Sequence, residues 1–137
     1  MNAYVDASVI LRMVLGEPGR LKVWRAISSG VTSTLTEVEV LRTLDRLRIA
    51  QRITDRDVST YREAAYRLLQ RLTIFEVSRS LLSRASQPFP TLVGTLDAVH
   101  LSTALVCRER GDELVFATHD AELAVAARAS GFKIVGA

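Results

Sequence analysis

Short runs rich in β-branched and aromatic residues alternate along this chain with longer segments that have helical periodicity. Five runs are predicted as strands, at residues 3–5, 31–33, 74–77, 114–117 and 133–135. Parallel strands need a long crossover connection, and a helix usually supplies it. The alternation therefore predicts an α/β fold whose largely parallel sheet is covered by helices on both faces.

Three helical segments carry most of this pattern. Residues 54–72 place apolar side chains at a 3.6-residue period, and Thr54 is a candidate N-cap. Residues 35–50 look similar, whereas residues 95–109 are apolar throughout and are expected to be better buried. Thr95 is the candidate cap of that last segment.

Breaks between these segments are marked by proline and glycine. Residues 87–91 contain two of the three prolines, so this loop is expected to be irregular. Gly131 is expected to end the last helix. Trp24 lies at helical spacing from Leu21 and Ile27, which favours a place in the core or a subunit interface over a base-stacking platform.

Composition limits the class of protein. A chain of 137 residues with 48% hydrophobic content suits one domain over residues 1–137 with a substantial core. The single cysteine, Cys107, cannot form an internal disulfide, and no leader is apparent, so we expect an intracellular, cytoplasmic protein. The apolar runs are shorter than the ~20 residues of a membrane span, so no membrane partner is expected.

The charge is mildly basic and comes mainly from arginine. The formal net charge is +3, and arginines crowd the segment between Arg42 and Arg71. The planar guanidinium suits phosphate. Acidic residues are interleaved with these arginines, however, so solvated helix faces with i,i+4 ion pairs are the plainer interpretation.

Four acidic residues are spread where a metal nuclease needs them. Asp6 and Asp120 each follow a predicted strand, and Glu39 and Asp97 lie in predicted helices. Ligand sites in open parallel sheets collect at the carboxyl ends of the strands. If the helices begin at the same edge, all four carboxylates can point into one crevice.

Such a cluster needs compensation. Two carboxylates about 4 Å apart repel by roughly 4 kcal/mol at an effective dielectric near 20. Hard divalent cations such as Mg²⁺ or Mn²⁺ suit carboxylate oxygens, and the sequence has no cysteine and histidine cluster for zinc. A site of this kind activates water for in-line hydrolysis of a phosphodiester, leaving a 5′-phosphate and a 3′-hydroxyl.

Each acid also has a structural alternative. Asp6 and Asp120 are placed to cap the helices that follow them, although Ser8 could cap the first equally well. Asp97 would interact favourably with a helix dipole. Glu39 could face solvent, but its apolar neighbours suggest a partly buried carboxylate that needs a partner.

Several polar residues nearby remain open to two interpretations. His100 follows Asp97 by three residues and is either a ligand, an orienting group or, as the favoured interpretation, a packed core histidine. His119 is expected to be exposed. Ser8 and Thr118 either position a carboxylate or metal-bound water by hydrogen bonding, or serve only at strand ends.

Taken in order, residues 4–10, 38–44, 96–104 and 117–120 resemble the PIN-domain family. The size, without appended domains, is similar to that of VapC-type toxins of type II toxin–antitoxin systems. The resemblance implies a three-layer α/β/α sandwich with a mostly parallel central sheet and Mg²⁺- or Mn²⁺-dependent endoribonuclease activity. It also implies inhibition by a small DNA-binding antitoxin, and a homodimer.

Carried over by position, the resemblance assigns the catalytic acids as Asp6, Glu39, Asp97 and Asp120. Asp6 and Asp97 would hold the metal, and Asp120 would assist. Glu39 is chosen over its neighbouring acid because the Val-Leu-Arg pattern follows it. Arg42, which ends that pattern, becomes a candidate for RNA phosphate contacts.

Other functions compete with this one. A catalytically inactive PIN-like module would bind RNA or protein without cleavage, and a housekeeping PIN nuclease would act without an antitoxin. Phosphoryl transfer through Asp6 as nucleophile would favour a second aspartate two residues on, where Ser8 stands instead. For the nuclease, structured RNA with an accessible single-stranded loop is the expected substrate.

Overall fold

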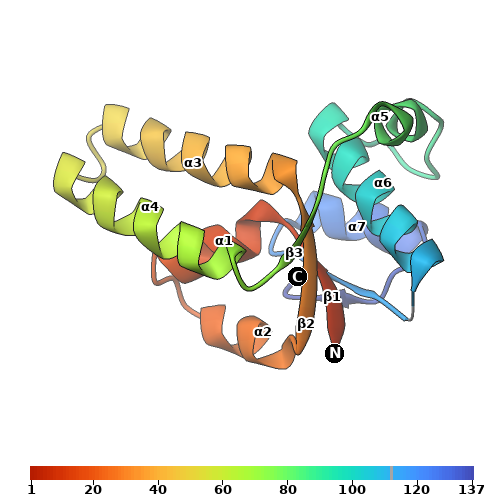
Figure 1. Ribbon diagram of the computed structural model, residues 1–137, viewed down its shortest axis with the longest axis horizontal. Coiled ribbons are helices and arrows are strands. Elements are labelled where there is room, and N and C mark those ends of the chain that lie inside the picture. Colours follow the sequence, from red (N-terminus) through yellow and green to blue (C-terminus); the bar gives the residue numbers. More distant parts are fainter. Residues whose placement is uncertain (112) are drawn as a thin grey trace.

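The computed structural model describes residues 1–111 and 113–137. Strands and helices follow one another along the chain as β1 (Asn2–Val5), α1 (Ala7–Val14), α2 (Arg20–Ala26), β2 (Ser29–Ser33), α3 (Thr34–Ile49), α4 (Asp55–Leu69), β3 (Thr73–Phe75), α5 (Arg79–Ala85), α6 (Thr95–Arg110), β4 (Val115–Ala117), α7 (Ala121–Ala129) and β5 (Ile134–Val135). Figure 1 shows the α3–α4 hairpin at one side of the molecule and α5, α6 and α7 at the other.

A single five-stranded sheet forms the middle layer, with the order β3-β2-β1-β4-β5. Every neighbouring pair in it is parallel, which confirms the predicted parallel sheet. β1 is the central strand and pairs with β2 on one side and β4 on the other. The carboxyl ends of β1 and β4 therefore lie next to each other.

The two faces of the sheet support separate apolar clusters, as the alternation of side chains along a strand requires. Ala3 and Val5 of β1 belong to a cluster with residues of α1, α2, α3 and α4. Tyr4, between them, belongs to the opposite cluster with residues of α6 and α7. This arrangement confirms the three-layer α/β/α sandwich (Figure 1).

Helix ends at Thr54 and Gly131 agree with the sequence-based prediction, and the one at Thr95 does not. Thr54 caps α4 in a reciprocal capping box with Asp57, as expected. Gly131 follows the end of α7 with a φ of 90°, a conformation that suits glycine. Thr95 was wrongly predicted as a cap: it is the first residue of α6, and Gly94 occupies the N-cap position without a side-chain hydrogen bond.

Burial of the helices follows their composition. In α6, seven consecutive residues from Ala98 to Ala104 are buried, as its apolar sequence predicts. α4 buries only Ala65 and Leu69 fully, which suits a helix with one apolar stripe. Trp24 of α2 packs against the cluster that contains Val5, so its interpretation as a core residue is confirmed.

Two features of the chain between α4 and α6 differ from the sequence-based expectation. The third strand, β3, runs from Thr73 to Phe75 rather than over residues 74–77. The short helix α5 was missed. It begins at the N-cap Ser78, whose hydroxyl accepts a hydrogen bond from the Leu81 amide at 3.2 Å. Residues 87–91 are irregular, as their prolines predict.

The ion pairs on α3 differ in spacing from the i,i+4 pairs that were predicted. Arg42 and Arg48 both contact Asp45, at i,i+3 spacing and at distances of 3.2 and 2.9 Å. Because Asp45 lies between the two arginines, it serves both of them. Arg48 also lies 3.7 Å from Asp55 at the start of α4, so it links the two helices of the hairpin.

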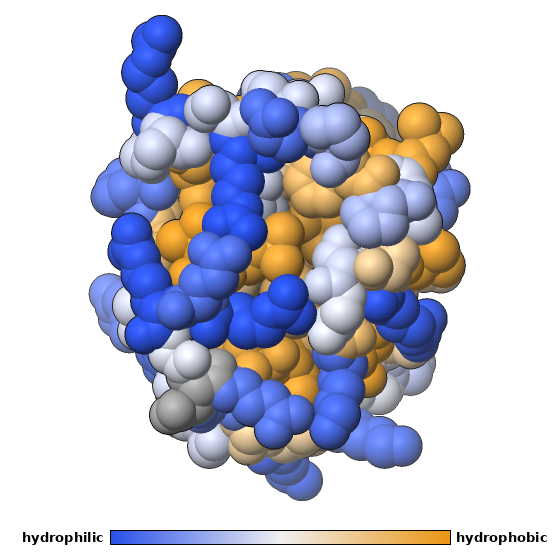
Figure 2. Space-filling view, turned by 90° about the vertical axis from the view of Figure 1, so that its right-hand side faces the viewer, coloured by the Kyte–Doolittle hydropathy of each residue, from blue (hydrophilic) through white to orange (hydrophobic). Residues whose placement is uncertain are grey.

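Across residues 1–111 and 113–137, none of the helices is long and apolar enough to cross a bilayer. Figure 2 shows the face on the side of α5, α6 and α7, where hydrophobic residues reach the surface between hydrophilic ones. Leu82 of α5 and Leu96 of α6 are among the exposed large hydrophobic residues of the chain.

Candidate active site

The four predicted acids come from four different elements around one edge of the sheet. Asp6 directly follows β1, and Asp120 lies three residues after the end of β4. Glu39 lies in the second turn of α3, and Asp97 in the first turn of α6. The charges of Asp120, Asp6 and Glu39 all act on Asp97. The fold therefore brings the four carboxylates into electrostatic contact.

Asp6 is the most deeply buried of the four acids, with 4% of its surface exposed. It is the N-cap of α1, and its Oδ1 accepts hydrogen bonds from the Ser8 amide at 3.1 Å and the Val9 amide at 3.4 Å. The cap interpretation is thus confirmed for Asp6, and Ser8 does not take that role. The cap also fixes the orientation of the carboxylate.

Ser8 and Thr118 complete the shell around Asp6. The Ser8 hydroxyl donates to Oδ1 at 2.6 Å, and the Thr118 hydroxyl donates to Oδ2 at 2.8 Å. Ser8 in turn accepts from the His119 amide at 2.8 Å, and Thr118 accepts from the Asp120 amide at 3.0 Å. Both hydroxyls therefore position the Asp6 carboxylate and also join the ends of β1 and β4.

Electrostatics at Asp6 reflect two opposing effects. Burial raises the pKa of Asp6, because a charge is poorly solvated there, while the hydrogen bonds from Ser8 and Thr118 offset part of that rise. The net direction is upward. A cation beside the carboxylate would shift the same balance towards the ionised form.

Glu39 is held by a histidine. Its side chain is 27% exposed, and its Oε1 contacts Nε2 of His100, whose side chain is almost fully buried. Nδ1 of His100 lies 2.6 Å from the hydroxyl oxygen of Tyr4, which is also fully buried. His100 is therefore packed in the core, as the favoured interpretation had it, and at the same time contacts a candidate catalytic acid.

Tyr4 was not predicted as part of this site. A tyrosine in an apolar strand indicates only a buried aromatic side chain, although its position between Ala3 and Val5 already directs it to the opposite face from them. Burial raises the pKa of Tyr4 well above its ordinary value, and the charge of Asp6 adds to that rise. The phenol therefore keeps its proton at neutral pH.

Asp97 is partly buried, and its carboxylate accepts no hydrogen bond from the part of the chain that the structure describes. Burial raises the pKa of Asp97, and the charge of Asp120 raises it further, with smaller effects of Asp6 and Glu39. His100 acts in the opposite direction. At Asp97, the charges of the three other acids therefore add to the effect of burial.

Asp120 lies on the exposed side of the group. It caps α7, and its Oδ1 accepts from the Glu122 amide at 2.9 Å and from the Leu123 amide at 3.1 Å. The cap interpretation is confirmed here as well. Capping uses one oxygen of the carboxylate and leaves the other directed to neither of these amides.

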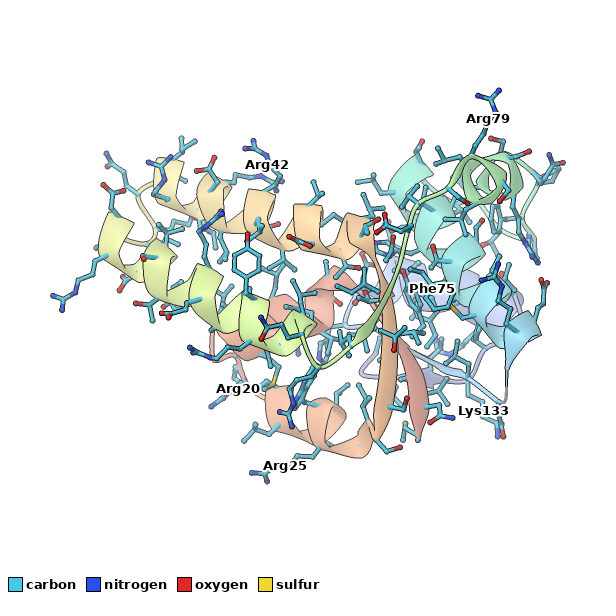
Figure 3. The ribbon with its side chains drawn as sticks, in the orientation of Figure 1. Arg20, Arg25, Arg42, Phe75, Arg79 and Lys133 are labelled. Atoms are coloured by element: carbon cyan, nitrogen blue, oxygen red, sulfur yellow. The ribbon has the colours of Figure 1, made fainter. Side chains whose placement is uncertain are left out.

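Two further predicted residues, Arg42 and His119, lie at the edge of the acid cluster. Arg42 is on the outer side of α3 (Figure 3), and its side chain is 68% exposed. His119 was wrongly predicted to be exposed: it is partly buried, because its Nδ1 lies 3.0 Å from the Gly136 carbonyl oxygen. Its backbone amide, not its ring, takes part in the site.

The chemistry of the donor set fits a hard divalent cation, since it consists of carboxylate oxygens. Among residues 1–111 and 113–137, however, no three histidine, cysteine, aspartate or glutamate side chains are already close enough to hold an ion together. Asp6 is fixed by four protein donors, whereas Glu39 and Asp97 are partly exposed. An ion at this edge would therefore have to draw the less constrained carboxylates towards it.

Curated relatives match nearly the whole chain. Ribonuclease VapC47 of Mycobacterium tuberculosis (strain CDC 1551 / Oshkosh) is 28% identical over 136 residues, which cover 94% of this chain and 92% of that protein. Ribonuclease VapC46 of Mycobacterium tuberculosis (strain ATCC 25618 / H37Rv) is 29% identical over 136 residues, covering 96% and 95% respectively.

Solved structures share the fold. A toxin–antitoxin complex from Klebsiella pneumoniae superposes with a TM-score of 0.68 at 16% identity, covering 97% of this chain and 95% of that one. Mycobacterium tuberculosis VapC20, described as a toxin that cleaves the sarcin–ricin loop, gives a TM-score of 0.64 at 20% identity, covering 98% of both chains.

The match to a known family covers most of the chain. Residues 3–129 match the PIN domain. This range includes all four acids and both hydroxyl residues that hold Asp6, and the fold agrees with that of the solved structures. By sequence and by fold, this chain belongs to the PIN-domain family.

Proposed function

We propose that this protein is a metal-dependent endoribonuclease that hydrolyses RNA phosphodiester bonds with a metal-activated water, and that it is the toxin of a VapBC-type toxin–antitoxin pair. The observation that carries the proposal is the gathering of Asp6, Glu39, Asp97 and Asp120 at one edge of a PIN-domain sheet. Relatives over nearly the whole chain are named ribonucleases, which supports the same conclusion.

Residue roles follow from the surroundings of each acid. Mg²⁺ or Mn²⁺ would bind to Asp6 and Asp97. Ser8 and Thr118 hold the Asp6 carboxylate by hydrogen bonds, and a cation would reduce the repulsion between Asp97 and the other acids. An ion held there would supply charge stabilisation at the phosphate and would lower the pKa of a water molecule. Glu39 and Asp120 would add negative charge around it. Arg42, which lies on the outer side of α3 (Figure 3), would contact RNA phosphate.

A protein partner is also proposed. One structural neighbour is a toxin–antitoxin complex, and another is VapBC2 from Rickettsia felis bound to a DNA fragment from its promoter, with a TM-score of 0.66 at 10% identity. These neighbours show only a shared fold. A small antitoxin and a homodimer remain predictions for this chain. A short neighbouring reading frame that encodes a DNA-binding protein would support the antitoxin.

The test compares the wild type with Asp6→Asn and Asp97→Asn on a pool of cellular RNA. Reactions contain Mg²⁺, Mn²⁺ or a chelator, and new 5′-phosphate ends are mapped. We expect cleavage that requires metal and falls about 100-fold or more in both variants. Asp55→Asn is the matched control, because Asp55 also lies in the first turn of a helix but is 89% exposed.

Folding of each variant is checked by circular dichroism. If all four proteins fold and the wild type cleaves no RNA under any condition, the proposal fails and a binding-only PIN domain replaces it. Cleavage that persists in chelator, or in folded Asp6→Asn and Asp97→Asn, would overturn the metal-dependent mechanism while leaving a nuclease.

A further inference from the structure

A buried chain of hydrogen bonds runs from the core of the molecule to the acid cluster. Its members come from three elements: Tyr4 from β1, His100 from α6 and Glu39 from α3. Tyr4 is 0% exposed and His100 is 1% exposed. The Tyr4 hydroxyl lies 2.6 Å from Nδ1, and Nε2 contacts Oε1 of Glu39. Each ring nitrogen of His100 therefore has its own partner.

The partners determine which nitrogen carries the proton. An ionised carboxylate only accepts hydrogen bonds, so Nε2 must be the donor to Glu39. If the ring carries one proton, the remaining nitrogen, Nδ1, accepts from the Tyr4 hydroxyl. The tautomer of a histidine is set by the hydrogen bond that its other nitrogen makes. For a ring with one proton, Tyr4 thus favours the tautomer that donates to Glu39 through Nε2.

Packing alone does not require this arrangement. Burying a polar ring is unfavourable unless its nitrogens are hydrogen-bonded, and an apolar side chain would fill the same space without that need. Here the second partner is a carboxylate that is 27% exposed and that acts electrostatically on Asp97. The His100 ring therefore links Tyr4 of the central strand to Glu39, whose charge acts on the partly exposed Asp97.

The contact has a mechanical consequence for Glu39. A free glutamate side chain samples many rotamers, and fixing it in one of them costs conformational entropy. Oε1 is fixed by His100, while Oε2 accepts no hydrogen bond from the described residues. One oxygen is anchored, and the other is available to the site.

We propose that His100, anchored by Tyr4, is a positioning residue that holds the Glu39 carboxylate in the acid cluster. The role in catalysis rests on the proposed nuclease function, whereas the geometric part does not. Outer partners that orient a metal-site carboxylate typically change metal affinity or activity by about 10- to 100-fold when removed. That is the size of effect we expect.

The central variant is the double substitution Tyr4→Phe with His100→Leu. It removes both buried polar groups together, which is far less disruptive than leaving one of them unpaired. The core then contains apolar side chains at both positions, but Glu39 loses its hydrogen bond to His100. His100→Gln is the conservative variant, since its amide N–H can still donate to Glu39. Tyr66→Phe on α4 removes a hydroxyl from a tyrosine that is 40% exposed and serves as the control.

Kinetics with saturating Mn²⁺ separate positioning from simple packing. We expect the double variant to lower kcat about 10-fold or more while the KM for RNA stays unchanged, because no RNA contact is removed. His100→Gln should recover part of the loss, and Tyr66→Phe should match the wild type. A folded double variant with the kcat of the wild type would overturn the proposal.

Two measurements do not depend on cleavage. The chain has only two histidines, His100 and His119, so ¹⁵N NMR of the metal-free protein resolves both rings, and His119→Gln assigns them. We expect the His100 ring to be the Nε2–H tautomer, with a downfield Nε2 proton that moves in Glu39→Gln. Calorimetry should show weaker Mn²⁺ binding by about 10-fold in the double variant.

These results distinguish the two proposals. If the wild type cleaves no RNA but shows the Nε2–H tautomer and a His100-dependent Mn²⁺ affinity, the nuclease function fails and the positioning role stands. An Nδ1–H tautomer, or Mn²⁺ affinity equal in the wild type and the folded double variant, would overturn the positioning role whatever the activity.

Discussion

The strand half and the helix half of the acid cluster are built differently. The strand half, which comprises Asp6, Ser8 and Thr118, surrounds a carboxylate with two hydroxyl donors and two backbone amides. The helix half comprises Glu39 and Asp97. There, Glu39 has one histidine contact, and Asp97 has no hydrogen bond from the residues that the structure describes.

The carboxylate in the strand half is held in position by hydrogen bonds, whereas the carboxylates in the helix half repel one another with few hydrogen bonds to offset it. In the strand half, hydrogen bonds offset the burial of a charge, so the position of the carboxylate is fixed before any ion arrives. In the helix half, burial and neighbouring carboxylates raise the pKa of Asp97, and few contacts oppose them. The strand half would therefore fix the position of a bound ion, and the helix half would gain most from its charge, because the ion would reduce the repulsion at Asp97.

The strand half should be the more sensitive to loss of a hydrogen bond. Thr118→Val keeps the shape of the side chain but removes the donor to Asp6 and the acceptor for the Asp120 amide. We expect the free energy of unfolding at pH 7 to fall by about 2 kcal/mol, measured by chemical denaturation. Thr60→Val, at an exposed position of α4, should change it by less than about 0.5 kcal/mol.

The loss in Thr118→Val should also depend on pH. The Thr118 hydrogen bond lowers the pKa of Asp6, so its removal raises that pKa further. A carboxyl whose folded pKa is raised costs stability above its unfolded pKa and costs nothing below it. The difference between Thr118→Val and the wild type should therefore be largest at neutral pH, shrink as the pH falls towards the ordinary aspartate pKa, and change no further below it. An equal loss at all pH values would contradict this account.

The helix half should gain stability when its charge is removed. Asp97→Asn eliminates a carboxylate whose pKa is raised, so the thermal midpoint at pH 7 should rise by a few degrees at most, because Asp97 is partly exposed. This gain should disappear at a pH below the ordinary aspartate pKa, where the carboxyl is protonated in both states. Differential scanning calorimetry at both pH values measures it.

Asp55→Asn again provides the matched control for Asp97→Asn. It makes the same chemical change in the first turn of α4, where the helix dipole favours a negative charge and no acid cluster opposes it. Its midpoint should stay level or fall slightly. A rise of equal size in both variants would show that the acid cluster does not strain the helix half.

The smallest effect is expected outside both halves, on the surface of α3. Arg42→Ala should weaken binding of single-stranded RNA by the catalytically inactive Asp6→Asn protein, and reduce the slope of log affinity against log salt by about 0.7. The change is modest because Asp45 already contacts Arg42 at 3.2 Å. Arg25→Ala on α2, on the other side of the molecule (Figure 3), is the control and should leave the slope unchanged.

Local features were the ones that the sequence predicted well. The parallel sheet followed from alternating strand and helix patterns, and the capping of α4 by Thr54 followed from a residue beside its helix. The spread of Asp6, Glu39, Asp97 and Asp120 indicated the edge of the sheet where they meet. Errors were also local: α5 is too short for a periodic pattern, and Gly94 rather than Thr95 occupies an N-cap.

The sequence by itself placed Asp6 and Asp120 after strands, where each could cap the next helix, because a cap needs only a carboxylate next to the first turn. Only the tertiary structure decided what surrounds them. Tyr4 and His100 are 96 residues apart, and His100 and Glu39 are 61 residues apart. Their contacts arise because β1 lies in the centre of the sheet and α3 and α6 pack beside it. Contacts between residues so far apart in the sequence cannot be predicted from the type of each residue or from its neighbours along the chain.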